Sequence, residues 1–363
     1  MIDRQHFQEI DWRLIVLLLL NTALGIAAIY SSSHQAGGAY FLKQFTFAAF
    51  SLVMLFFILA VDYKTLMTFA LPVYVLIVAV LAAMIPFART TAGTKSWIRM
   101  PFFQIQPSEI LKVVLILVLA QLFGAAKKTF VTRTIALTGA GAVFVPFVLV
   151  ALQPDLATAV CYIPILAAAL ILAGRTKKTL VVLLIIIVLL SLVTWNLTLK
   201  DYQKKRIMTF LSPGQDTQGA GYQIRQSKIA IGSGGLLGKG FKKGSQSQLR
   251  FLPARHTDFI FSVIGEEFGF AGSLAALILY YLFLGRLFKS VGQSRDRAGV
   301  YISFLASSFI AFQFFINILM IIGVLPIAGI PLPLLSYGGS SLTATFLAVG
   351  LILNVKMRRF ANV

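Results

Sequence analysis

Three acidic side chains stand near one junction of this chain, where a basic polar stretch runs into an apolar one. The stretch QSQLRFLPARHTDFIFSVIGEEFGFAG carries Asp258, Glu266 and Glu267, and Arg255 and His256 precede the aspartate. A carboxylate at such a boundary, partly withdrawn from water and beside cations, has the position of a general base. It could equally cap the helix that follows, and burial and cations push its pKa in opposite directions. Adjacent glutamates cannot face the same way on a helix, so we expect at least one of them to be structural.

A second group of ionisable side chains lies where another polar segment leads into an apolar one. In QIQPSEILK, Glu109 and Lys112 are three residues apart, so on a helix that begins at Pro107 they share a face. The glutamate also lies in the first turn, where the helix dipole favours a negative charge. The pair is either an ion pair at a helix start or part of a polar cavity, the default hypothesis for ionisable residues in a membrane span.

Asp155 separates two apolar runs in LVALQPDLATAV, directly after Pro154. An aspartate at the start of a helix is often only a cap, and a carboxylate at the end of a span can also belong to a site. Because Asp155, the 109–112 pair and Asp258 all fall at the predicted outer ends of spans, one shared polar site is the functional alternative.

A long basic segment, residues 199–257, precedes this junction and mixes cations with apolar residues and glycines. A connection of this length is usually functional or disordered. It could lie on the outer membrane interface with its cations at phosphate level, or its cations and glycine backbone could bind a phosphorylated substrate. Both can hold. The cations considered are Arg206, Arg225, Lys228, Lys239, Lys242, Lys243, Arg250 and Arg255.

The composition indicates the element that must position these groups, the membrane helix. Hydrophobic residues make up 58% of the 363 residues, 31 are Phe, and the mean hydropathy is +0.87, which is far from a soluble domain. We predict an all-α integral membrane protein, a single membrane domain over residues 1–363 with ten transmembrane helices and a large external loop, 199–257, between helices 7 and 8. The predicted spans are 12–30, 44–61, 66–87, 109–125, 134–152, 156–173, 179–198, 260–286, 300–323 and 336–355.

The distribution of Lys and Arg predicts the orientation. With the N-terminus inside, most short-loop cations fall on one side, which predicts that both termini are cytoplasmic and that the long loop is external. The positive-inside loops and that external loop account for the net charge of +20, so no nucleic acid is needed to explain it. The single cysteine, Cys161, excludes an intramolecular disulfide, and no P-loop or GxGxxG element suggests an organic cofactor.

Taken together and in order, the motifs resemble those of the SEDS family (shape, elongation, division and sporulation) over nearly the whole chain. They are SWI, QPSEILK, QPDLATA, GYQIRQSKIAIGSGGLLGKG, HTDFIFSVIGEEFGFAG and PIAGIPLPLLSYGGSS. The stretch LPIAGIPLP and the compact termini favour the RodA-like, rod-shape branch. Two positions depart from the family pattern, Ala157 where Gly is common and Ala254 where an acidic residue often precedes His-Thr-Asp.

The resemblance implies a peptidoglycan glycosyltransferase in the bacterial plasma membrane, polymerising lipid II on the outer face during elongation. Asp258 would be the general base, or would hold a divalent metal such as Mg or Mn that does the same work. The resemblance also implies a class B penicillin-binding protein and other cell-wall elongation proteins as partners. A lipid II flippase and a non-enzymatic scaffold are the alternatives. The residues expected to bind substrate are Trp97, Glu109, Lys112, Asp155, Arg206, Lys228, Lys239, Arg255 and His256.

The stretch GIPLPLLSYGGSS breaks the chain before the last span with two prolines and two glycines. Irregular backbone is tolerated at membrane depth only where protein or water covers it. We therefore expect this stretch to pack against the polar cavity, and we assign it no catalytic role.

The predicted orientation is testable with topology reporters. Reporters fused after Gly174 and after Lys289 should be cytoplasmic, and one inserted near Gly219 should be external, because the short-loop cations set the orientation. Alkaline phosphatase and green fluorescent protein fusions would measure this, and a cytoplasmic signal at Gly219 would overturn the placement of the site.

Overall fold

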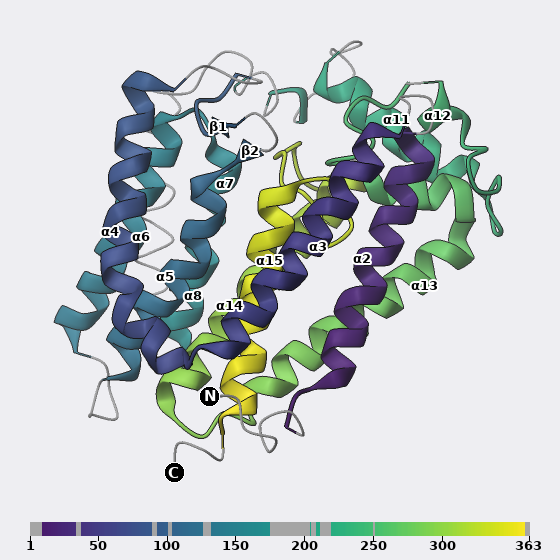
Figure 1. The fold of residues 1–363 in the computed structure, drawn as a ribbon. Coiled ribbons are helices and arrows are strands. Elements are labelled where there is room, and N and C mark those ends of the chain that lie inside the picture. The colour runs from purple at the N-terminus through teal and green to yellow at the C-terminus, as the bar shows by residue number, and fades with distance from the viewer. Residues whose placement is uncertain are drawn as a thin grey trace.

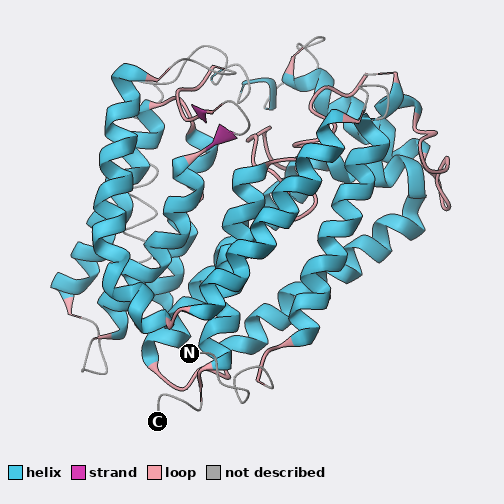
Figure 2. Ribbon diagram, viewed as in Figure 1, coloured by secondary structure: helices cyan, strands magenta, loops and turns pink. Residues whose placement is uncertain are grey.

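The computed structural model describes residues 9–33, 38–88, 93–100, 104–125, 132–174, 204, 208–210, 219–249 and 251–359. Within these residues the chain is a bundle of long helices (Figures 1 and 2). The long helices are α2 (Trp12–Ser33), α3 (Ala39–Ala60), α4 (Tyr63–Phe87), α5 (Pro107–Gly124), α6 (Arg133–Leu152), α13 (Ile260–Val291), α14 (Arg297–Ile321) and α15 (Gly339–Met357). The shorter helices are α7 (Leu156–Val160), α8 (Ile163–Leu172), α11 (Ala220–Ser233) and α12 (Ser245–Gln248).

The prediction of an all-α membrane bundle is confirmed. Eight described helices are long and apolar enough to cross a membrane. The predicted span 179–198 lies outside the described residues, so the count of ten, the single-domain division and the position of the 199–257 loop stay predictions. The helix predicted over 156–173 was wrong as one continuous element, since it is interrupted at Cys161–Tyr162 between α7 and α8. Pro164 explains the break, because it has no amide hydrogen to donate to Val160.

The helices differ in how much of them lies inside the bundle. α15 is the innermost, with 89% of its most apolar window buried, and α5 and α14 are also largely buried. α3, α4 and α6 turn most of their apolar side chains outward, as lipid-facing helices do. In Figure 1, α15 and α3 separate a group of α4 to α8 from a group formed by α2, α11, α12 and α13. α14 and α15 each contact helices of both groups, so these two buried helices join the halves of the bundle.

A two-stranded antiparallel ribbon precedes α5. β1 (Ile98–Arg99) pairs with β2 (Gln104–Ile105), with Ile98 opposite Ile105. β2 leads directly through Gln106 into Pro107, the first residue of α5. The ribbon therefore sets where α5 begins.

α13 is broken at Gly269, whose φ of 65° and ψ of −158° are not helical. The glycine-rich loop before α12 fills the break: the amides of Lys239 and Gly240 donate to the carbonyls of Glu266 and Glu267, at 3.0 and 2.9 Å. On the other side of the break, Phe270 and Ala271 donate to loop carbonyls, at 2.8 and 3.0 Å. The loop supplies the partners that the broken helix lacks, as the absence of water in a bilayer requires.

The two glutamates beside this break are both structural. The Glu266 carboxylate accepts from Lys239 Nζ at 2.8 Å and from the amides of Gln246 and Ser247 at 2.8 and 3.1 Å. Glu267 Oε1 accepts from the Ser31 hydroxyl on α2, at 2.5 Å. Both side chains are fully buried, so each holds part of the loop or of α2 against the upper half of α13.

A buried ionic cluster ties the far ends of three helices together. Asp11, which precedes α2, binds Arg286 of α13 through both carboxylate oxygens, at 2.7 and 2.9 Å, and Lys356 of α15 at 2.6 Å. Burial raises the pKa of Asp11, but hydrogen bonds from Arg286 and Lys356 outweigh it and hold the pKa below its ordinary value of 3.8. The start of α2 and the end of α15 therefore lie at the same end of the bundle.

Replacing Asp11 should destabilise the protein in a pH-dependent way. Asp11→Asn leaves Lys356 and Arg286 without their anion, and breaking a buried pair should lower the free energy of unfolding by about 3 kcal/mol. Because the folded pKa of Asp11 is below 3.8, its stabilisation is complete above that value and is lost as the pH falls through the folded pKa. Denaturation of wild type and variant in detergent between neutral and acidic pH measures both effects.

Asp62→Asn is the matched control. Asp62 pairs with Arg358 at 3.6 Å and its side chain is 30% exposed, and asparagine still caps α4, so its loss should matter by less than about 1 kcal/mol. Equal effects of the two substitutions would contradict a special role for the buried cluster.

Candidate active site

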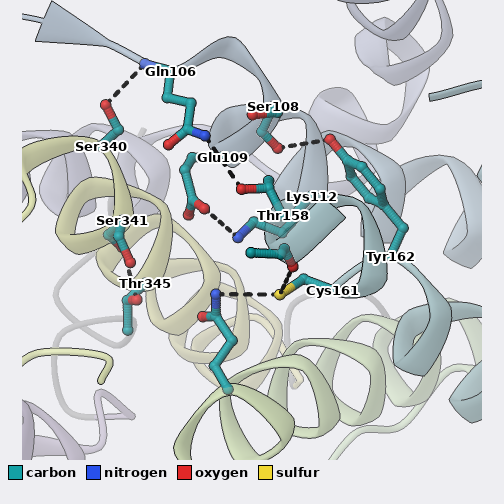
Figure 3. Close-up of polar contacts among 12 residues, drawn as sticks. Gln106, Ser108, Glu109, Lys112, Thr158, Cys161, Tyr162, Ser340, Ser341 and Thr345 are labelled. Carbon is teal, nitrogen blue, oxygen red and sulfur yellow. Dashed lines mark hydrogen bonds and ion pairs between the residues drawn. The ribbon is translucent and has the colours of Figure 1, made fainter. Parts of the chain in front are cut away.

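The first turn of α5 carries a dry ion pair. Lys112 Nζ lies 2.6 Å from Glu109 Oε1, and the two side chains are 0% and 4% exposed (Figure 3). Lys112 Nζ also lies 4.9 Å from the centre of the Phe309 ring of α14. Glu109 Oε2 is buried and has no hydrogen-bond partner among the described residues. The ion-pair interpretation is therefore correct, and one acceptor of the pair is left over inside the bundle.

Asp155 caps a helix and binds a second element at the same time. Its Oδ1 accepts from the Thr158 amide at 3.2 Å, at the start of α7, which confirms the cap. Its Oδ2 accepts from Gln106 Nε2 at 2.7 Å, and the same nitrogen lies 3.2 Å from Thr158 Oγ1. Gln106 immediately precedes α5, so Asp155 connects the start of α7 to the start of the helix that carries Glu109.

Asp258 lies half-buried in the tight turn that leads into α13. The Ala254 carbonyl accepts from the amides of Thr257 and Phe259, at 3.1 and 3.3 Å. Ala254 has a φ of 51°, a conformation that non-glycine residues rarely adopt. Ala254, one of the two positions that depart from the family pattern, is thus the residue that closes this turn.

The two basic residues before Asp258 differ in charge. Arg255 Nε donates to the Ser32 carbonyl at 2.7 Å, which ties the turn to the end of α2. The His256 ring lies 4.4 Å from the Tyr40 ring and 5.7 Å from the Tyr337 ring, measured between centres. Burial, and then the Arg255 charge, lower the pKa of His256 from its ordinary value. The lowered pKa favours the neutral form of His256 at pH 7, so Arg255 is the charged member of the two.

The start of α15 connects these separate groups. Ser336 and Tyr337, just before α15, donate to the carbonyls of Thr257 and His256, at 2.6 and 2.8 Å. Ser340, in the first turn, accepts from the Gln106 amide at 3.0 Å (Figure 3). A continuous set of hydrogen bonds thus runs from the Asp258 turn through residues 336–340 to Gln106 and Asp155. The tertiary structure brings together three motifs that are more than 40 residues apart in the chain.

Three of the remaining predicted site residues, Lys239, Lys228 and Trp97, lie elsewhere in the described structure. Lys239 is held by Glu266 at the α13 break, and its side chain is 28% exposed. Lys228 is exposed on α11, with its ammonium group against Gly323 after α14. Trp97 is half-buried just before β1, and Arg206 lies outside the described residues. Substrate contacts by these four residues stay predictions.

Several polar residues of this region were not singled out from the sequence. Gln106 and Ser340 join the α5, α7 and α15 starts, and Asn317 on α14 is fully buried. A polar side chain inside an apolar span was the available signal, because such residues usually face the bundle interior. Spacing alone could not tell which of many Ser, Asn and Gln residues would meet.

No group of three or more His, Cys, Asp or Glu side chains in the described part of the chain is arranged to hold a metal ion. The metal role predicted for Asp258 remains untested.

Comparison with known proteins places the chain in a family. The model described as "Cell cycle protein", which covers FtsW, RodA and SpoVE, matches residues 11–360. The chain belongs to the FtsW/RodA/SpoVE family. This confirms the resemblance to SEDS proteins that the motifs indicated.

Individual members of the family are similar over nearly their whole length. The peptidoglycan glycosyltransferase MrdB of Escherichia coli K12 is 34% identical over 359 residues, which cover 98% of this chain and 95% of MrdB. A chain in the structure reported as "Structural coordination of polymerization and crosslinking by a peptidoglycan synthase complex" matches with a TM-score of 0.82 and 28% identity, over 97% of this chain and 98% of that one. The rod shape determining protein RodA of Thermus thermophilus matches with a TM-score of 0.73 and 27% identity, over the same shares of the two chains.

The dry pair on α5 predicts a characteristic pattern of stability. Glu109→Gln should lower the free energy of unfolding by about 3–5 kcal/mol, because it leaves Lys112 as a buried cation without its anion. The double variant Glu109→Leu with Lys112→Met should recover most of that loss, since apolar replacement of a whole buried pair is often neutral. Unfolding in detergent measures both, and a double variant as unstable as the single one would refute this account.

Proposed function

We propose that this protein is a peptidoglycan glycosyltransferase that polymerises lipid II into glycan strands. The observation that carries the proposal is the nearly full-length similarity to MrdB, which is named for this activity. The fold supports it, because Asp258, Asp155 and the 109–112 pair are gathered by the start of α15. The named relatives do not favour the flippase alternative.

The proposed reaction joins two lipid-linked sugars. The 4-hydroxyl of the acceptor sugar attacks the anomeric carbon of the donor MurNAc, a new carbon–oxygen bond forms with inversion, and the bond to the lipid diphosphate breaks. Asp258 accepts the proton of the attacking hydroxyl. Its half-buried position at the entrance to α13 suits this role, since a general base must be within hydrogen-bond reach of its proton and partly shielded from water.

The leaving diphosphate needs its charge balanced and needs no general acid. Arg255 is the described cation closest in sequence to Asp258, and the basic loop offers further candidates in Lys228, Lys239 and Arg206. A divalent cation such as Mg or Mn would supply the same charge if bound. Asp258 would be one of the residues that hold such an ion, and the base role stands without it.

The 109–112 pair and Asp155 are proposed to line the subsite for one sugar headgroup, with Trp97 as a stacking surface. The buried Glu109 Oε2, which has no partner in the described structure, is an acceptor available to a substrate hydroxyl. If this is right, the Glu109→Leu with Lys112→Met variant is folded and yet inactive.

The RodA-like branch and a penicillin-binding partner complete the proposal. The matching structures include a rod shape determining protein and a chain of a peptidoglycan synthase complex that coordinates polymerization with crosslinking. A class B penicillin-binding protein is the corresponding partner for this chain. The proposed setting is the bacterial plasma membrane, with both termini in the cytoplasm and the site on the outer face.

Removing the proposed base should abolish strand synthesis without unfolding the protein. Asp258→Asn keeps the size of the side chain but cannot accept a proton at neutral pH, so the rate should fall by about 100- to 10,000-fold. The measurement is polymerisation of labelled lipid II by purified protein with its penicillin-binding partner in detergent.

The Asp62→Asn variant serves as the active control, because Asp62 lies beside Arg358 at the opposite end of the bundle. Near-normal synthesis by folded Asp258→Asn would disprove the base assignment. No synthesis by the wild type would instead disprove the polymerase and return attention to lipid II transport.

A further inference from the structure

The backbone beside Asp258 is held from outside its own turn. Three successive carbonyl groups, those of residues 256, 257 and 258, each accept a hydrogen bond from a distant part of the chain. The donors are, in that order, the Tyr337 amide at 2.8 Å, the Ser336 hydroxyl at 2.6 Å and Asn317 Nδ2 at 3.0 Å. Three bonds in a row leave this segment little freedom to rotate its peptide planes.

Asn317 is the only one of these three donors that comes from a side chain of a membrane helix, near the end of α14. It lies on α14 with 0% exposure, and its Nδ2 also donates to the Ile330 carbonyl at 2.8 Å. Both neighbours are carbonyl oxygens, so only the NH₂ end of the amide can face them. One side chain therefore links the Asp258 peptide to the irregular segment 326–338.

The oxygen of the Asn317 side-chain amide shows that an asparagine at this position has a cost. This oxygen, Oδ1, is buried and has no hydrogen-bond partner among the described residues, which is unfavourable in a bundle interior. A leucine, whose side chain has the same number and branching of heavy atoms, would not carry that unpaired oxygen. The two carbonyl bonds are thus what this asparagine contributes.

The segment 326–338, to which Asn317 donates at the Ile330 carbonyl, is itself held by other residues. Ser336 Oγ accepts from the Leu332 amide at 2.8 Å, and Gln44 of α3 donates to the Ser336 carbonyl at 3.2 Å and accepts from the Gly338 amide at 3.1 Å. α2 lies close by: a Cβ added at Gly25 would stand 2.6 Å from Leu335 Cα. Asn317 therefore connects the Asp258 peptide to a rigid part of the bundle.

We propose that Asn317 is a positioning residue for Asp258. Its bond to the Asp258 carbonyl fixes the peptide plane directly after the Cα that carries the carboxylate, and so fixes where the carboxylate points. A misplacement of about 1 Å at a reacting group can slow catalysis by about 100-fold. This inference rests on the proposed role of Asp258 as the base.

The test compares Asn317→Leu with Ser307→Ala. The leucine keeps the branched four-atom shape of the side chain and removes both donor hydrogens. Ser307 lies on the same helix and donates to the Ser303 carbonyl of its own helix, at 2.7 Å. For each full-length variant we would measure kcat and KM for lipid II, the pH dependence of kcat, unfolding in detergent, and hydrogen exchange of the amides in residues 254–259.

Asn317→Leu should lower kcat at least tenfold, with KM changed less than twofold, and should shift the acidic limb of the pH profile, because the surroundings of the base have changed. Exchange at residues 254–259 should become faster. Ser307→Ala should leave all of these at wild-type values. Asn317→Asp, which puts acceptors against two carbonyls, should be as slow as Asn317→Leu.

Normal kcat in a folded Asn317→Leu protein overturns the inference. So does a loss of activity that follows the fraction unfolded, with the pH profile unmoved, because that is a purely structural effect. Asp258→Asn measured in parallel separates the two proposals. If Asp258→Asn stays active, the base assignment fails, and hydrogen exchange alone decides whether Asn317 fixes the turn. Unchanged exchange at residues 254–259 in Asn317→Leu then rejects the role of Asn317, and faster exchange supports it.

Discussion

Hydrocarbon offers no hydrogen-bond partner, and this constraint governs every irregular feature of the structure. Where α13 breaks at Gly269, a loop 30 residues earlier supplies the missing donors and acceptors. Where the chain is irregular before α15, Gln44, Ser336 and Asn317 satisfy the exposed backbone groups. A soluble protein could leave such groups to water. Here each break is instead a place where distant elements must meet.

The start of α15 is where this constraint and the proposed chemistry coincide. The same residues that satisfy the broken backbone also bind the Asp258 turn on one side and Gln106 on the other. A reactive carboxylate needs a surrounding that is dry, polar and rigid together. An interrupted helix whose backbone groups are all paired provides such a surrounding, whereas a regular apolar helix would offer no polar groups to build it from.

Buried charge is handled in three different ways. Asp11 is shared between two cations, and Glu266 is surrounded by one cation and two backbone amides. Glu109 has Lys112 alone, and its second oxygen lacks a partner in the described structure. Glu267, which holds α2 through Ser31, likewise leaves its Oε2 without a partner in the described structure, so incomplete pairing does not by itself mark a substrate site. The incompletely paired Glu109 lies at the proposed site, which is where a substrate could complete it.

The sequence by itself determined the fold class and eight of the predicted spans in their approximate places, because the length of an apolar run is a local property that decides whether a helix can cross a bilayer. It also indicated the family, through motifs read in order. Only the tertiary structure decided that Pro164 divides one span, that Glu266 and Glu267 hold a loop, and that Gln106, Ser340 and Asn317 join the motifs. Periodicity tells which face of a helix is buried, but the partner on that face comes from packing between segments that can lie 345 residues apart.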